Sequence, residues 1–336
     1  MGRAQQKARL RSPLRRGGLA AGPLRGGRMS RLDRQSFLGS DSDRILHELT
    51  VGYVGLGGGG SHVAQQAAHL GIGGHVLVDG DIVEDTNLNR LVSGTAKDAK
   101  DKRLKVDIAA RTIKAVNPSA RVKKCPVPWQ QALEELKGCD VIIGGLDSMV
   151  AKDDLDRFCR RHLIPYIDMG MDVHDTGGQY LIAGQVVLLS PGCPCLRCFG
   201  VVTEDGLAQE AKRYGAAGSR PQVVWPNGVL ASLAIGLLTQ LVTPWHRGGV
   251  SSAYLEYDGN KNTVRSSPRV AMLGDRPCPH TSALDTGDAR FDIREDPKRK
   301  PSSPVAADLA TDGAAQSATR RILRKLGIRL RPTPGT

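Results

Sequence analysis

A glycine-rich turn near residue 57 constrains the fold of this 336-residue chain more than any other feature. The apolar run at 51–54 leads into Gly55-Leu-Gly-Gly-Gly-Gly60, and residues 61–70 then have a helical composition. Between a strand and a helix, a G-x-G-x-x-G turn lets the backbone approach a phosphate closely, and the helix N-terminus offers free N–H groups. The sequence therefore predicts a nucleotide site on a βαβ unit.

Strands and helices alternate after this turn. Such alternation is typical of an α/β fold with a doubly wound, mostly parallel, Rossmann-like sheet. The predicted strands are 75–79, 121–125, 140–144 and 165–170, and the predicted helices are 102–116, 130–137 and 149–162. An alternating segment at 178–189 and a last strand at 253–258 predict a C-terminal antiparallel extension. Between them we expect a polar loop at 200–222 and an apolar helix at 225–242.

The net charge of +13 is concentrated at the two ends of the chain. Residues 1–30 supply +8 and residues 285–336 supply +4, so the middle is nearly neutral. We expect a disordered basic N-terminal tail over 1–30, one folded domain over 31–282 and a disordered C-terminal tail over 283–336. Within the second tail, 316–330 has the pattern of a short amphipathic helix. Because the excess charge lies in the tails, a nucleic-acid partner is not expected.

The composition also indicates in which cellular compartment the protein is expected. No apolar run approaches the ~20 residues that a membrane helix needs, and the Arg-rich start lacks the apolar core of a signal peptide. Met29, just before the patterned sequence, is a candidate for the true start. Seven cysteines are an odd number for a disulfide framework, so we expect a cytoplasmic protein without membrane association.

Charged residues decide which nucleotide the turn holds, because the glycines alone fit NAD as readily as ATP. Arg34, Arg90 and Lys105 can place positive charge against a triphosphate. Asp147 follows an apolar strand, where its carboxylate can hold Mg²⁺, and Asp79 ends another strand, where it can hydrogen-bond ribose hydroxyls. A dehydrogenase needs no such cationic set, so the sequence favours ATP.

The order and spacing of these motifs resemble the ThiF/MoeB/HesA family, which includes the adenylation domains of ubiquitin-activating enzymes. The resemblance covers about 31–282, and two positions depart from it: Leu91 replaces a glutamine and Ser148 an asparagine. Neither departure removes a charged group. The matching residues are Arg34 in Arg-x-x-Arg-Gln, Gly55, Gly57, Gly58, Gly60, Asp79, Asp81, Asn87, Arg90, Lys105 twelve residues before Asn117-Pro118, and Asp147.

The resemblance implies a role for each matching group. The glycine turn, Asp79 and Asp81 would bind ATP, with Asn87, Arg90 and Lys105 on its phosphates. Asp147 would coordinate Mg²⁺, and Arg34 would be an arginine finger from the partner subunit of a homodimer. A protein C-terminal carboxylate would attack the α-phosphorus of ATP and give an acyl-adenylate and pyrophosphate. The cationic groups would stabilise the negative charge that develops on the phosphate oxygens.

Two pairs of metal-ligating residues lie about eighty positions apart. Cys195 and Cys198 form a Cys-x-x-Cys turn, and Cys278 and His280 form Cys-x-His. Structural Zn²⁺ takes four such ligands in a tetrahedron. The resembled family commonly has Cys-x-x-Cys at both places, so the second pair is a departure. Cys193 is the alternative fourth ligand.

The position of the other cysteines argues against a stable thioester on this chain. Residues 199–277 contain no cysteine, whereas relatives that form a thioester generally carry it after the zinc turn. Cys125, Cys139 and Cys159 fall on predicted strands and helices, where a buried thiol is expected. A separate conjugating or sulfur-transfer protein would then receive the acyl group.

The partner implied by the resemblance is a ubiquitin-like or sulfur-carrier protein of the β-grasp type. The strands at 178–189 and the loop at 200–222 would receive its tail. Asn227 and Gly228 either line that channel or cap the following helix. The alternatives are a tRNA-modifying dehydratase of the same family, an NAD-dependent oxidoreductase and a catalytically silent scaffold. A scaffold would be expected to lack Lys105 or Asp147.

Overall fold

The computed structural model describes residues 31–212, 221–246, 250–274, 276, 278–281 and 287. The basic N-terminal tail, with Met29, lies outside these residues, as does the helix expected at 316–330. Those expectations therefore stay predictions.

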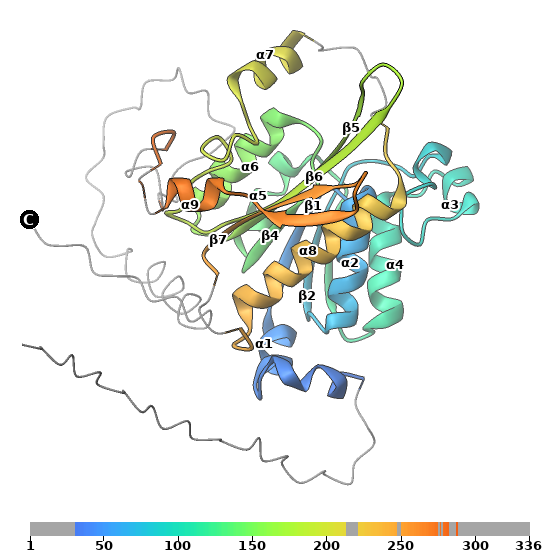
Figure 1. Ribbon diagram of the computed structural model, residues 1–336. Helices are drawn as coiled ribbons and strands as arrows, with labels where there is room; N and C mark the ends of the chain where they lie inside the picture. The colour runs from blue at the N-terminus through green and yellow to red at the C-terminus, as the bar shows by residue number, and fades with distance from the viewer. Residues whose placement is uncertain are drawn as a thin grey trace, which may run out of the picture.

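An eight-stranded sheet forms the centre of the fold, in the order β3-β2-β1-β4-β5-β6-β7-β8 (Figure 1). The first five strands in this order run parallel, and β6, β7 and β8 are added antiparallel. This confirms the predicted doubly wound, mostly parallel sheet with an antiparallel extension. The strands are β1 Thr50–Val54, β2 Gly74–Val78, β3 Arg121–Cys125, β4 Val141–Gly144, β5 Tyr166–Asp175, β6 Tyr180–Leu189, β7 Ser252–Asp258 and β8 Thr263–Ser266.

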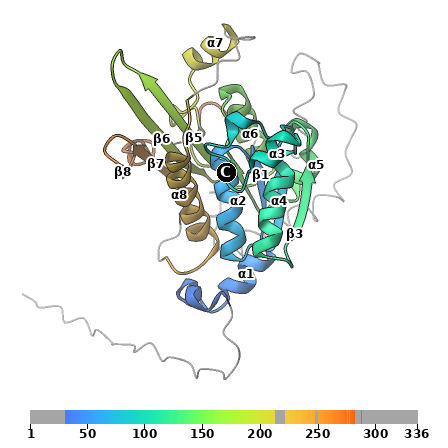
Figure 2. The same cartoon turned by 90° about the vertical axis from the view of Figure 1, so that its right-hand side faces the viewer.

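Helices cover both faces of the sheet. The α-helices are α1 Ser42–Glu48, α2 Gly58–Leu70, α3 Ala96–Lys100, α4 Lys105–Val116, α5 Leu133–Lys137, α6 Met149–Arg161, α7 Glu204–Lys212, α8 Val224–Val242 and α9 Arg269–Leu273. The short 3-10 helices are η1 Asp33–Leu38, η2 Asp85–Asn87 and η3 Trp129–Gln131. Figure 2 shows α2, α4 and α8 side by side on one face, while α5 and α6 pack on the other.

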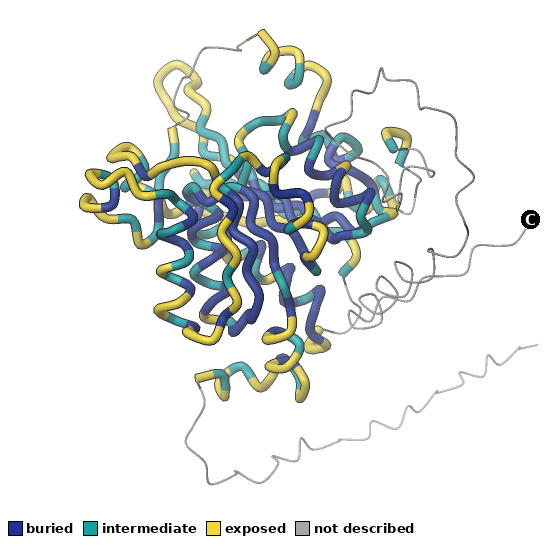
Figure 3. Tube along the Cα trace, turned by 180° about the vertical axis from the view of Figure 1, so that it is seen from behind, coloured by how far each residue is buried: buried dark blue, intermediate teal, exposed yellow. Residues whose placement is uncertain are grey.

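The burial of β1 explains why its sequence is apolar throughout. Successive side chains of a strand point to opposite faces of the sheet. Val51 and Tyr53 join the core beneath α2 and α8, whereas Val54 joins the core beneath α5 and α6. A strand covered on both faces has to be apolar along its length. Figure 3 shows the central strands in dark blue because they are buried. The tip of the β5–β6 hairpin is exposed and is drawn in yellow.

Helix α8 corrects one expectation about composition. By length and composition its 19 residues are apolar enough to cross a membrane, and it is the one such helix among the described residues. An apolar run of nearly spanning length is therefore present. Half of its most apolar window is buried, and its side chains, among them Leu230, Ala234 and Leu238, pack into the core with α2 and the sheet. Helix α8 is therefore part of the core of this fold.

Two segments differ from the sequence-based expectation. The predicted polar loop at 200–222 contains a helix, α7, and the chain continues past the predicted last strand into β8 and α9. Helix α7 has no buried residue, and all four residues of β8 are exposed. Neither element therefore needs an apolar pattern, and a hydrophobic periodicity could not reveal them.

Candidate functional site

A cavity of about 560 Å³ opens at the carboxyl ends of β1 and β4. From β1 the strand order runs one way through β2 to β3, and from β4 it runs the other way. Ligands of open α/β sheets bind at this reversal. Eight of the residues predicted for the nucleotide site line the cavity: Gly55, Gly57, Gly58, Asp79, Asp81, Arg90, Lys105 and Asp147.

The glycine turn owes its shape to close backbone contacts. Gly55 has a φ of 85°, in the left-handed region that favours glycine. A Cβ on Gly60 would lie 1.9 Å from the carbonyl oxygen of Gly55, so only glycine fits there. Gly60 is buried beneath the turn and does not line the cavity, whereas a Cβ on Gly57 would meet nothing within 4 Å. The turn therefore presents bare backbone to the cavity.

Asp79 ties the glycine turn to the next strand. Its carboxylate accepts hydrogen bonds from the backbone N–H of Leu56, at 2.6 Å, and of Asp81, at 2.8 Å. Burial raises the pKa of Asp79, and nearby Lys105 opposes that shift. Asp79 thus holds the turn in place, and its contact with a ribose remains a prediction.

The cationic residues of the cavity are held by neighbouring oxygens. Lys105 Nζ lies 2.7 Å from Asp81 Oδ2, and the Lys105 side chain is only 12% exposed. Arg90 donates to the carbonyl oxygen of Thr86 at 2.7 Å. Both side chains line the cavity, so two positive charges face the same space as Asp147.

Besides Gly60, the predicted residues Asn87 and Arg34 lie outside the cavity lining. The side-chain oxygen of Asn87 accepts a hydrogen bond from the backbone N–H of Glu84 at 3.1 Å and so stabilises η2. Arg34 is exposed on η1, which precedes β1 and lies at the opposite end of the sheet from α7 and the β5–β6 hairpin (Figure 1). Arg34 therefore does not belong to the cavity of its own chain.

Lys152 lines the cavity and belongs to a buried ion pair that the sequence analysis did not predict. Lys152 Nζ donates to both oxygens of Asp168, at 2.9 and 2.8 Å, and to the carbonyl of Met169 at 2.9 Å. The hydroxyl of Tyr166 donates to the same carboxylate at 2.9 Å. Buried charges require such pairing. The available signal was Asp168, an acid within the otherwise apolar segment predicted as a strand at 165–170.

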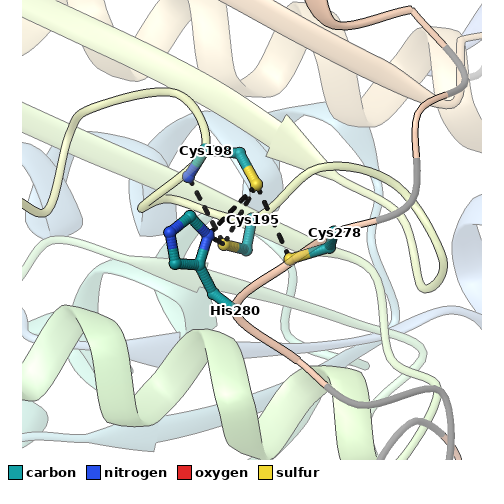
Figure 4. Close-up of side chains that lie close together, drawn as sticks. All are labelled: Cys195, Cys198, Cys278 and His280. Carbon is teal, nitrogen blue, oxygen red and sulfur yellow. Dashed lines mark hydrogen bonds between the residues drawn. The ribbon is translucent and has the colours of Figure 1, made fainter.

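The Cys-x-x-Cys pair and the Cys-x-His pair lie together in a second cluster, the Cys/His cluster (Figure 4). One ligand atom from each of Cys195, Cys198, Cys278 and His280 lies within 4.8 Å of the others. Cys198 Sγ is 3.6 Å from Cys195 Sγ, 3.6 Å from Cys278 Sγ and 3.3 Å from His280 Nδ1. A tetrahedral zinc with bonds of ~2.3 Å to sulfur separates its ligands by about this much. The donor set fits a metal ion.

The cluster distinguishes between the two candidates for the fourth ligand. His280 belongs to it, whereas Cys193 does not, and the Sγ of Cys193 faces the carbonyl of Ser251 at 3.6 Å. Burial opposes ionisation of Cys278, but hydrogen bonds from Cys195 and the backbone of His280 bring its pKa down to about 6. A thiolate is the form that a metal requires.

The remaining cysteines are buried, as expected. Cys125, Cys139 and Cys159 are at most 6% exposed. Burial raises the pKa of Cys139 to about 12 and also raises that of Cys159. A buried thiol with a raised pKa is a poor nucleophile. These three residues therefore act as core side chains.

Asn227 both lines the cavity and stabilises its own helix. Its Nδ2 donates to the carbonyl of Val223 at 2.8 Å, and its side chain packs against Gly58 of the glycine turn. Gly228 faces His62 instead and lies outside the lining. Asn227 therefore lies on the cavity wall, but it is not the cap of α8, whose N-cap is Val223 with no side-chain cap hydrogen bond.

Comparison with known proteins identifies the family. The sequence model of the ThiF family matches residues 30–279, and the chain belongs to this family. It is 29% identical over 262 residues to the sulfur carrier protein adenylyltransferase of Thermus thermophilus, covering 74% of this chain and 92% of that protein. The match to the SAMP-activating enzyme E1 of Haloferax volcanii is 31% identical, over 54% of this chain and 64% of that one.

Solved structures give the same fold. The crystal structure of E. coli MccB with ATP superposes with a TM-score of 0.57 over 71% of each chain, at 21% sequence identity. At that identity the likeness speaks for the fold alone. The family match over residues 30–279 is what confirms the predicted family resemblance.

Proposed function

We propose that this chain uses ATP to adenylate the C-terminal carboxylate of a ubiquitin-like or sulfur-carrier protein. The observation that carries the proposal is the cavity at the carboxyl ends of β1 and β4, where a bare glycine turn faces Lys105, Arg90 and Asp147. The relatives support the same class, because the Thermus protein is a sulfur carrier protein adenylyltransferase and the Haloferax protein an activating enzyme.

The cavity supplies what the reaction needs. The ionised carboxylate attacks the α-phosphorus, the bond to the β-phosphate oxygen breaks, and pyrophosphate leaves with that electron pair. Lys105 and Arg90 stabilise the charge that develops on the phosphate oxygens, and Asp147 would hold Mg²⁺. No general base is required, because a C-terminal carboxylate is already ionised at pH 7.

The tail of the carrier would enter along β5 and β6. The cavity extends from the glycine turn to Asp172, Ala183 and Gln185 on these strands, and Gln222, which follows α7, lines it as well. This supports 178–189 and 200–222 as the face that receives the carrier. With Cys125, Cys139 and Cys159 buried, the acyl group passes to a separate sulfur-transfer or conjugating protein rather than to a thiol of this chain.

A homodimer would complete the site. Arg34 lies away from the cavity of its own chain and so can act only on a partner's. Beside it, Phe37 is 68% and Trp245 41% exposed, with ring centroids 6.3 Å apart. Exposed aromatic surface of this kind favours a protein interface.

The Cys/His cluster would hold structural Zn²⁺ through Cys195, Cys198, Cys278 and His280. We place the catalytic domain at 31–282 with tails on either side, in a cytoplasmic enzyme. Neither the zinc nor the domain limits enter the chemical step.

The test is ATP–pyrophosphate exchange with a panel of β-grasp proteins that end in Gly-Gly. Asp147→Ala should lower exchange at least 100-fold, because one charge-stabilising group is worth about that much or more. Asp85→Ala, an exposed aspartate outside the cavity lining, is the matched control. Absence of exchange with every carrier, together with tight NAD binding, would overturn the proposal. Full activity of Asp147→Ala would remove the Mg²⁺ role.

A further inference from the structure

Helix α7 rests on the first turn of α6, immediately after Asp147. The carboxylate oxygen Oε2 of Glu210 accepts the backbone N–H of Met149 at 2.7 Å and that of Val150 at 3.4 Å. Nearby, a Cβ on Gly206 would lie 2.3 Å from the sulfur of Met149, so α7 approaches α6 closely at a glycine. The two helices are in direct contact beside the cavity.

Glu210 completes the hydrogen bonding of the α6 N-terminus. The first N–H groups of a helix have no partner within it. Here Ala151 N–H donates to the side chain of the N-cap residue Ser148 at 3.1 Å, and Met149 and Val150 donate to Glu210. An anion at this end also interacts favourably with the helix dipole. The carboxylate of Glu210 therefore accepts hydrogen bonds from two N–H groups that have no acceptor within α6.

A second contact holds the other end of α7. Arg197, in the turn of the Cys/His cluster, donates to both carboxylate oxygens of Asp153 on α6 at 2.8 Å. Its remaining nitrogen pairs with Glu204, at the first residue of α7. Helix α7 has no fully buried residue, and Leu207 is its partly buried contact with the core, so these polar contacts add to a small amount of apolar packing in fixing it.

We propose that Glu210 is a positioning residue for the nucleotide site, through its clamp on the first turn of α6. Asp147 and Met149 line the cavity, and so do Val201 and Gln222 on either side of α7. A shift of the clamp at Met149 therefore moves the neighbouring Asp147, the carboxylate proposed to hold Mg²⁺. The inference rests on the proposed function, because Glu210 would position Asp147, the residue proposed there to hold Mg²⁺.

The experiment compares Glu210→Ala and Glu210→Gln with Asp205→Asn in the full chain. Asp205 is exposed on the same helix, so its variant controls for the loss of one charge. Hydrogen exchange of the protein alone should be at least 10-fold faster at the Met149 and Val150 amides in Glu210→Ala. Glu210→Gln keeps an acceptor oxygen without the charge and should fall between that variant and the wild type.

Calorimetric binding of ATP with and without Mg²⁺ then tests the positioning role. With Mg²⁺, Glu210→Ala should bind ATP about fivefold more weakly, whereas binding in EDTA should be unchanged. A merely structural contact would lower both affinities together or neither, and either result would overturn the positioning role. Unchanged hydrogen exchange in both Glu210 variants would overturn the clamp. If the wild type itself binds no ATP, the proposed function fails, and hydrogen exchange alone decides the clamp.

Discussion

The nucleotide cavity and the Cys/His cluster are built in opposite ways. The charged groups of the cavity come from separate segments, and several stay partly exposed, such as Asp81 with a side chain 71% exposed. The cluster takes its four donors from two short segments, at 195–198 and 278–280, within 4.8 Å of one another. A cavity of this kind leaves charges within reach of a ligand, whereas the cluster turns its donors toward each other. The first is suited to chemistry and the second to joining distant parts of the chain.

The largest expected effect concerns the cluster and is on stability. A metal ion bound there links residues 198 and 278, and in the chain-entropy model a cross-link around a loop of ~80 residues is worth up to about 4.5 kcal/mol. Cys198→Ser should therefore lose the metal and lower the free energy of unfolding toward that limit, as measured by elemental analysis and urea unfolding. Cys193→Ser is the control and should keep both. Metal loss in Cys193→Ser would contradict the assignment of His280 as the fourth ligand.

The next largest effect is expected at Lys105 in the cavity, where a substitution should lower activity far more than stability. Lys105→Ala should slow ATP–pyrophosphate exchange about 100- to 1,000-fold, equivalent to about 3–4 kcal/mol, because a cation is lost where negative charge develops. The ion-pair partner left behind, Asp81, is largely exposed, so the free energy of unfolding should change by no more than about 1 kcal/mol. Lys100→Ala, on α3, is the control. A large loss of stability in Lys105→Ala would mean that the cavity, like the cluster, is structural.

The smallest effect concerns the buried core near the amino end of β2, away from the cavity, where the packing excludes charge. His75 is 1% exposed on β2, and burial lowers its pKa from 6.5 to about 4. Between these two values the unfolded chain binds a proton that the folded chain does not. Stability should therefore fall as the pH drops from 6.5 to 4, by about 3 kcal/mol from this group.

Urea unfolding at pH 7 and pH 4.5 measures this loss. His75→Gln should show a smaller loss between the two pH values than the wild type. His69→Gln, at an exposed position on α2, should behave as the wild type does. An equal loss in His75→Gln and the wild type would show that His75 does not contribute to the pH dependence.

The sequence was most informative where residue type and local spacing carry the physics. Gly55 needs a positive φ, and Gly60 lies against a backbone carbonyl, so both follow from the turn alone. The predicted family and adenylyltransferase class were confirmed by the family match and the relatives. Spacing was less reliable for Asn87, which has the right position in the motif but stabilises η2 outside the cavity lining.

By itself, the sequence determined the βαβ unit, the glycine turn and the two pairs of metal-ligating residues, because each depends on residues close together in the chain. Only the tertiary structure decided that His280 completes the cluster rather than Cys193, that Lys152 and Asp168 form a buried pair, and that Glu210 reaches the start of α6. These contacts join residues between 16 and 85 positions apart. Their partners depend on how the strands and helices pack, and a local pattern does not contain that information.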